Sequence, residues 1–312
     1  IEYIPESVTL GFTSGIAIVI AVLQITDFTG ITIDSMPEHF IDKLIAISSQ
    51  LQQTDLGSFG IALFTLAVMI VWPRLGSRIP AHLPALVLAC LLGILLSWQG
   101  IDVDTIGSRF HYLLPSGEQA PGIPPYLPTF DWPWNRPGAD GQALGLSLNL
   151  ISELLPAAFA IAMLGAIESL LCAVVLDGMS GKRHSANSEL LAQGLGNLIT
   201  PFFGGVTATA AIARSATNFK TGAVSPIAAI VHSIVVLLSL LLLARILAYI
   251  PMPAMAALLI VVAWNMSEAA KSVKLVRSSP SSDVLVFLTC LSLTVFFDMV
   301  IAITAGIVLA SL

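Results

Sequence analysis

The sequence predicts an all-α polytopic membrane protein, and three observations lead to that fold class. The 312 residues are 56% hydrophobic and only 10% charged, whereas a soluble domain has about 25% charged residues. The mean hydropathy is +0.91. Apolar runs near the roughly 20 residues that a membrane helix needs recur along the whole chain, with room for roughly nine or ten spans. This composition excludes an ordinary soluble enzyme and a disordered tail. The 13 basic against 19 acidic residues leave no basic surface for a nucleic acid.

The first part of the chain contains three expected spans, at 4–24, 58–72 and 82–98. In the first of them, Gly11 and Gly15 form a small-residue face that lets another helix approach closely. The stretch that follows it, 27–55, is polar and acidic, yet apolar residues recur there at helical spacing. This pattern predicts a helix that lies on the membrane surface.

Residues 100–146 form a long polar region rich in Pro and Gly. Because Trp132 and Trp134 favour the membrane–water interface, we expect an ordered loop packed there. Alternation at Phe110, Tyr112 and Leu114 predicts a short strand. If the first span enters from the cytoplasm, eight lysines and arginines fall inside and four outside, so this loop is expected outside the cytoplasm.

The remaining spans follow this loop, and one segment among them is too short and too polar to cross alone. That segment is 204–220, and the orientation above requires it to count as a crossing. The expected spans around it are 154–176, 188–203, 224–247, 254–266, 284–296 and 300–312.

Glu168 lies in the middle of an expected span. A carboxylate at that depth is costly and is usually functional. It either carries a proton for part of the time or binds a cation. The structural alternative is a glutamate that a neighbouring helix satisfies.

The segment after Gly204 and Gly205 is the second signal. Thr207 or Thr209 is expected to cap a helix that begins near Ala210 or Ala211. A helix that starts inside a membrane leaves its first N–H groups unpaired and partly positive, and an anion can satisfy them. Arg214 adds a full charge one turn later. The alternative is a re-entrant packing loop in which Arg214 pairs with Glu168.

The other polar residues give weaker signals. The stripe of Asn187, Glu189, Gln193 and Asn197 is interpreted as polar contacts between helices. His232, inside a span, is interpreted as a satisfied core histidine in preference to a proton relay. The cysteines and histidines show neither metal nor disulfide spacing, and no nucleophile–base or nucleotide-binding motif is present. We therefore expect no metal, no cofactor and no enzymatic activity.

Three runs of residues together resemble the sulfate permease family of anion transporters. They are 163–178 around Glu168, 187–197, and Phe203-Gly-Gly, and the similarity extends over the whole chain. Within the family, residues 1–15, 205–214 and 264–268 look most like its C4-dicarboxylate transporters.

The resemblance implies a fold of two inverted repeats of seven segments, with a core domain, a gate domain and a discontinuous half-helix. This chain corresponds to segments five to fourteen, so the first four segments and the cytoplasmic STAS domain of the family are expected to lie outside it. The implied parts are gate spans at 1–99, an extracytoplasmic loop at 100–150, core spans at 151–248 and gate spans at 249–312.

The resemblance also implies site residues. It places ion coupling on Glu168. Sodium-coupled bicarbonate relatives have a hydroxyl one turn after their acidic residue; Cys172 occupies that position, and a thiol is a poor sodium ligand, so protons are favoured. It places the anion on the start of the half-helix, at Ala210, Ala211, Ile212, Ala213 and Arg214.

The function that the resemblance implies is proton-coupled uptake of a small anion, most of all a C4-dicarboxylate such as succinate, by an elevator-like motion. The expected partners are the anion, protons, the lipid of a cell inner membrane and a second copy in a homodimer. Sulfate or bicarbonate transport and an anion channel remain alternatives on the same scaffold.

Overall fold

The computed structural model describes residues 6–33, 35–37, 39–77, 79–114, 118–136, 142–297, 302, 305–306 and 309. The chain divides into two compact units. The central unit contains residues 126–241, and the terminal unit contains residues 2–125 together with 242–312. The predicted span 300–312 lies almost wholly outside the described residues.

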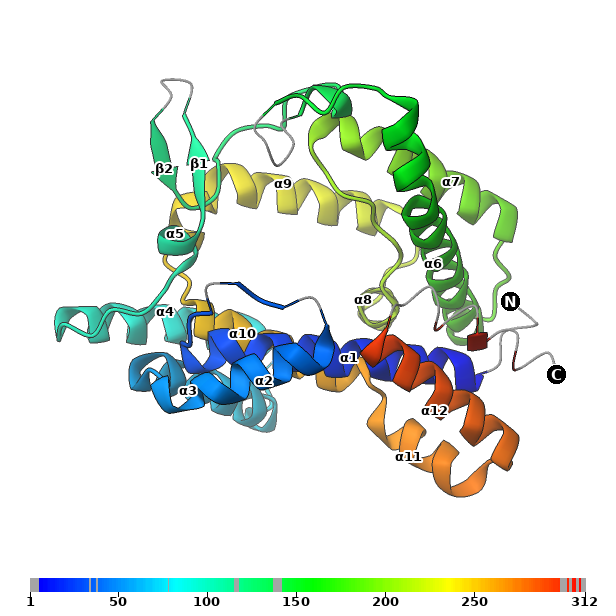
Figure 1. Cartoon of the computed structure of the whole chain (residues 1–312), viewed down its shortest axis with the longest axis horizontal. Helices are drawn as coiled ribbons and strands as arrows, with labels where there is room; N and C mark the ends of the chain where they lie inside the picture. The colour runs from blue at the N-terminus through cyan, green and yellow to red at the C-terminus, as the bar shows by residue number, and fades with distance from the viewer. Residues whose placement is uncertain are drawn as a thin grey trace. The chain divides into compact units, whose positions relative to one another are not determined.

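The terminal unit is a helical bundle in which α1 packs against α10 and α12, while α10 also packs against α3 (Figure 1). Ile61 and Ala89 cluster with Ala254, and all three are completely buried. Small side chains thus let these helices approach closely, as is usual in membrane bundles. Its helices are α1 (Glu6–Thr29), α2 (Phe40–Gln50), α3 (Leu56–Val71), α4 (His82–Trp98), α5 (Ile106–Arg109), α10 (Met252–Met266), α11 (Ala269–Ser278) and α12 (Ser281–Phe296), with short 3-10 turns η1 (Leu51–Gln53) and η2 (Trp72–Leu75).

The predicted glycine face of the first span is confirmed. A Cβ atom added to Gly11 would lie 2.6 Å from the backbone oxygen of Phe287, and one added to Gly15 would lie 2.6 Å from the Cβ of Thr294. Both neighbours belong to α12. The two helices therefore touch along the side of α1 that carries no side-chain volume.

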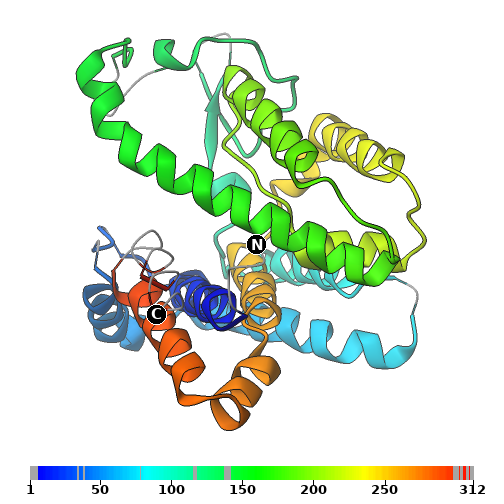
Figure 2. The same ribbon diagram turned by 90° about the vertical axis from the view of Figure 1, so that its right-hand side faces the viewer.

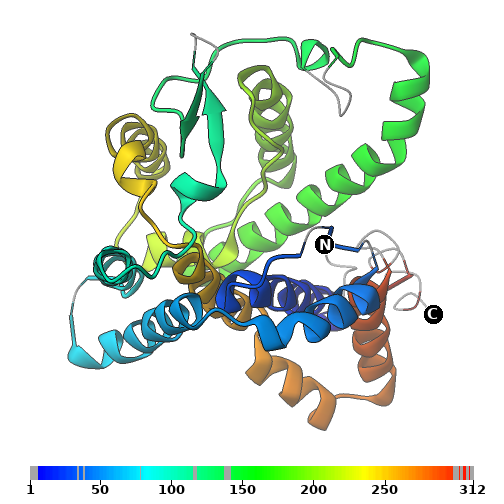
Figure 3. The same ribbon diagram turned by 60° about the vertical axis from the view of Figure 1, so that its left-hand side comes forward.

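The polar region between α4 and the central unit begins with an anchored hairpin. Strand β1 (His111–Leu113) pairs antiparallel with β2 (Gln119–Pro121), beside α5 (Figure 3). The amide of Gly107 donates to the carbonyl of Ala248 at 2.8 Å, which fastens the hairpin to the chain before α10. The short strand predicted from the alternation of Phe110, Tyr112 and Leu114 is thus confirmed.

The central unit contains the long helix α6, which is visible along its whole length in Figure 2. It begins earlier than predicted because the Ser147 hydroxyl caps it, accepting the amide of Leu150 at 3.1 Å, and Pro156 lies within it. The elements of this unit are η3 (Pro133–Asn135), α6 (Leu148–Ser180), α7 (Ala186–Ile199), η4 (Thr200–Phe203), α8 (Ile212–Lys220) and α9 (Ile227–Leu247), the last of which continues into the terminal unit.

The described helices agree with most of the predicted spans, and the differences lie at α7 and α11. Helix α7, at the predicted span 188–203, is not among the segments that are long and apolar enough to cross a membrane. By length and composition, five described segments could cross a membrane: α1, α3 with η2, α6, α9, and α10 with α11; α4 and α12 are apolar but shorter. Helix α11 was not predicted. It exists because Glu268 adopts a left-handed conformation, with φ of 42°, which ends α10 and redirects the chain.

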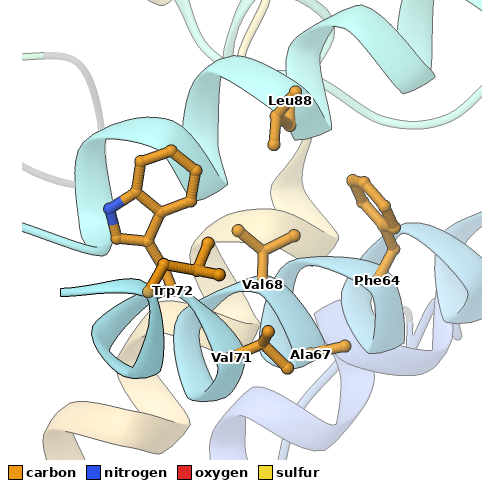
Figure 4. Close-up of a pocket in the computed structure, with 7 residues that line it drawn as sticks. Phe64, Ala67, Val68, Val71, Trp72 and Leu88 are labelled. Carbon is orange, nitrogen blue, oxygen red and sulfur yellow. The ribbon is translucent and has the colours of Figure 1, made fainter. Parts of the chain in front are cut away.

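An apolar groove of about 270 Å³ lies between α3 with η2 and α4 (Figure 4). Its polar edge is the Trp72 indole nitrogen, which already donates to the carbonyl of Ile79 at 3.1 Å. The groove therefore offers no free donor to an anion. Its lining is Phe64, Ala67, Val68, Val71, Trp72, Leu75 and Leu88.

We predict that Gly11→Ala lowers the melting temperature of the full-length protein in detergent. The added methyl group meets a backbone oxygen of α12 that cannot move aside, and such overpacking costs about 1–3 kcal/mol. Gly60→Ala is the matched control, because a Cβ atom at Gly60 in α3 meets nothing within 4 Å and alanine favours a helix. Equal losses in the two variants would contradict this explanation of the α1–α12 contact.

Candidate functional site

Helix α8 starts without a side-chain cap. Its N-cap residue is Ala211, in an extended conformation with φ of −113° and ψ of 107°. Among the described residues at this point, the amides of Ile212 and Arg214 make no hydrogen bond. The first intrahelical bond is donated by Ser215 to the carbonyl of Ala211. The first turn of α8 thus presents these two free donors and the positive end of its dipole.

The predicted threonine cap is wrong, because the helix begins at Ile212 and the threonines lie too far upstream. Thr209 instead ties the chain to α6: its hydroxyl donates to the carbonyl of Gly165 at 3.1 Å. The same hydroxyl lies 2.9 Å from that of Ser169. The extended approach to α8 is therefore anchored by side-chain contacts and not by a helix cap.

Two side-chain amides of α7 bind the extended segment that precedes α8, at Ala208. The side chains of Gln193 and Asn197 both donate to the carbonyl of Ala208 at 2.9 Å. The carbonyl oxygen of Asn197 also accepts the amide of Ala208 at 2.9 Å. Gln193 also contacts Ser169 of α6, so it forms the predicted contact between helices, whereas the contacts of Asn197 are to the extended segment alone.

Ser169 connects the three segments of the site. It lies next to Glu168 on α6 and is completely buried. Its hydroxyl accepts the amide of Ala210 at 3.3 Å and contacts both Gln193 and Thr209. The amide of Ala210, predicted as an anion contact, is therefore already occupied. Ser169 was not among the predicted site residues; the available signal was a hydroxyl beside a carboxylate in the middle of a span.

Glu168 and Arg214 do not form the ion pair that the alternative interpretation requires. Glu168 is half-buried on α6 and makes no hydrogen bond or ion pair with any described residue. Arg214 instead contacts α9, with its Nη2 2.6 Å from the Nε2 of His232. His232 is thus satisfied by a partner, but it is exposed in this chain and is not the core histidine that was predicted.

The chain that precedes α6 packs on η4, where α7 ends. Phe130 stacks on Phe202 of η4 at 5.6 Å with an interplanar angle of 5°, and the Arg136 guanidinium donates to the carbonyl of Pro201 at 3.1 Å. Gly204 follows with φ of 82°, where a Cβ atom would also lie 3.1 Å from Arg136. These contacts fix the point at which the chain leaves α7 for α8.

The turn between α6 and α7 contains a second histidine contact. The Nδ1 of His184 lies 2.8 Å from a carboxylate oxygen of Asp177. Among the described residues no group of three or more His, Cys, Asp or Glu side chains could hold a metal ion.

The site is therefore a broken span whose second half begins with free amides and a nearby arginine. Backbone amides at a helix start, supported by a guanidinium, bind negatively charged groups. The class of protein is a multi-pass helical membrane protein with a discontinuous helix, the arrangement by which many transporters form their binding sites.

The chain belongs to the Sulfate permease family, whose profile matches residues 1–290. It is 37% identical over 309 residues to the Bacillus subtilis protein named "Putative sulfate transporter YvdB", covering 99% of this chain and 54% of that protein. It is 27% identical over 320 residues to "Bicarbonate transporter BicA" of Picosynechococcus, covering 100% of this chain and 50% of that protein. The chain thus spans about half the length of these relatives.

Two solved structures share the fold. The structure of SLC26A9 matches with a TM-score of 0.81 at 20% identity, over 99% of this chain and 46% of the other. The transmembrane domain of the cyanobacterial transporter BicA matches with a TM-score of 0.73 at 23% identity, over 98% of this chain and 68% of the other. These matches confirm the all-helical membrane fold with seven-plus-seven inverted repeats, of which this chain supplies a part.

We predict that Asn197→Leu destabilises the full-length protein by about 1–3 kcal/mol, because two hydrogen bonds to Ala208 are lost at about 0.5–1.5 kcal/mol each. The measurement is thermal unfolding in detergent. Asn187→Leu is the control, since Asn187 is exposed near the start of the same helix. A melting temperature of Asn197→Leu equal to that of the control would show that this clamp contributes nothing.

Proposed function

We propose that this chain is the part of a secondary transporter that binds small oxyanions, with sulfate or bicarbonate as the substrate. The observation that carries the proposal is the pair of free amides at Ile212 and Arg214 at the start of α8. The names of the relatives favour sulfate or bicarbonate over the C4-dicarboxylates that the sequence favoured. A dicarboxylate remains the rival substrate, because backbone amides accept any anion.

The proposed binding set is the start of the half-helix. The amides of Ala211, Ile212, Ala213 and Arg214 face the anion, the Arg214 guanidinium supplies its counter-charge, and Ala210 contributes shape only. The small side chains before α8 let the anion reach the backbone.

The proposed motion separates the core spans at 151–248 from the gate spans at 1–99 and 249–312. The division of the chain into a central and a terminal unit supports this assignment, since the central unit covers 126–241. The core would carry the anion across while the gate stays fixed. The loop at 100–150 would lie outside the cytoplasm, and two copies would form a dimer in a cell inner membrane.

The proposed coupling ion is the proton, bound at Glu168. This carboxyl makes no hydrogen bond or ion pair with a described residue, so no partner holds it in one charge state. Cys172, one turn later on α6, replaces the hydroxyl that would complete a sodium site, and a thiolate or thiol is a soft ligand unsuited to sodium. Protons are therefore favoured over sodium.

We test the function by measuring the binding of sulfate, bicarbonate, succinate, fumarate and chloride to the full-length protein. The expected result is binding of sulfate or bicarbonate, and weaker binding of every anion by Arg214→Ala, by about 1.5–3 kcal/mol for a hydrogen bond to a charged group. Preferential binding of succinate would restore the dicarboxylate as substrate. Unchanged affinity in a correctly inserted Arg214→Ala protein would assign Arg214 a structural role.

We predict that Glu168→Gln retains anion exchange but loses proton-driven accumulation in proteoliposomes. A bound anion removes positive potential near the carboxyl and so favours its protonated form, which couples the two ligands by about 1–3 kcal/mol. Glutamine imitates the protonated carboxyl permanently. Uptake driven by a pH gradient is compared with counterflow. Intact proton-driven uptake in the variant would remove Glu168 from the coupling role, and uptake that never exceeds equilibrium in the unaltered protein would indicate a channel.

A further inference from the structure

One hydrogen bond joins Arg214 to His232, and its chemistry fixes the protonation state of the histidine. The Nη2 of Arg214 on α8 lies 2.6 Å from the Nε2 of His232 on α9. A guanidinium has five N–H donors, no acceptor, and a permanent charge. The Nε2 of His232 must therefore accept the bond, which requires a neutral imidazole with its proton on Nδ1. A protonated imidazole cannot make this contact.

No carboxylate in the described part of the chain competes for either partner. Arg214 reaches His232 from α8, and α8 packs against α6. Neither Arg214 nor His232 forms an ion pair there, and the carboxylate of Asp177 is engaged by His184. The ionisable side chains of α6, α8 and the part of α9 in this unit are Glu153, Glu168, Cys172, Asp177, Arg214, Lys220 and His232.

We propose that His232 is a proton-binding site that controls whether Arg214 is available to the anion. The inference rests on the proposed function and adds a residue to it. While the imidazole is neutral, it holds one edge of the guanidinium on the α9 side. A proton at Nε2 removes the accepting lone pair and places two positive groups in contact. The pair then separates, and the guanidinium turns its donors to the anion at the start of α8.

The sign of the coupling follows from this geometry. Acidification releases Arg214 and adds a positive charge beside it, so anion affinity rises as pH falls. By linkage, a bound anion that draws Arg214 away makes His232 take up a proton. Imidazole is the side chain whose charge ordinarily changes between about pH 5 and 8. The anion and the proton therefore bind together, as symport requires.

The test is the sulfate affinity of the full-length protein at about pH 5.5 and about pH 8, because imidazole changes charge between them. Sulfate is a suitable probe, since it stays a dianion throughout this range. The unaltered protein should bind sulfate more tightly at the lower pH, by a factor within the usual coupling range of roughly 5–150. His232→Gln keeps an acceptor but takes no proton, and should bind weakly at both pH values. His232→Leu has no acceptor, and should bind tightly at both.

Two controls distinguish the effect of His232 on the pH dependence of sulfate binding from the effects of other titratable side chains. His184→Gln removes the other histidine contact of the central unit and should leave the pH dependence intact. The series is repeated in a Glu168→Gln background, where that carboxyl cannot contribute to the pH dependence. Sulfate binding whose pH dependence survives in both His232 variants would overturn this inference and leave the proposed function standing. Absence of sulfate binding by every protein at both pH values would overturn sulfate as the substrate and this inference with it.

Discussion

The hydrogen bonds that hold Ala208 and Ala210 against α6 and α7 are the constraint on which the site depends. In a membrane, backbone polar groups need partners within the protein, and an extended segment has none of its own. Gln193, Asn197 and Ser169 supply them just before α8 begins. The chain can therefore stay extended up to Ala211 and start its helix late. Without these contacts, a continuous helix would satisfy the backbone at the lowest free energy, and the free amides at the start of α8 would be lost.

Side chains hydrogen-bond the backbone only up to the point where α8 starts. The segment up to Ala210 is bonded to side chains, whereas the amides of Ile212 and Arg214 have no partner among the described residues. Alanine at the N-cap position is decisive here, because Ser, Thr, Asp or Asn would fold back onto these donors. The site thus combines a hydrogen-bonded extended segment with unpaired amides at the start of α8, which is the preorganisation that anion binding needs.

The sequence predicted what depends on local pattern and missed what depends on contacts between distant segments. Apolar runs predicted the spans, and the start and end of α4 agree with its predicted bounds. The break at Gly204 and the half-helix after it were also predicted. The threonine cap was wrong because Thr209 has a better partner in Gly165, 44 residues away. Ser169 and the Arg214–His232 contact likewise arise only when three helices meet, which periodicity does not encode.

Arg214 differs from the backbone amides of this site because its side chain can change position. The amides at the start of α8 are fixed in the chain and accept any small anion with little discrimination. A guanidinium on a flexible side chain can change its position, and in this structure it is directed to His232 on α9. Selectivity and coupling can therefore reside in the position of one side chain, while the backbone supplies a constant attraction.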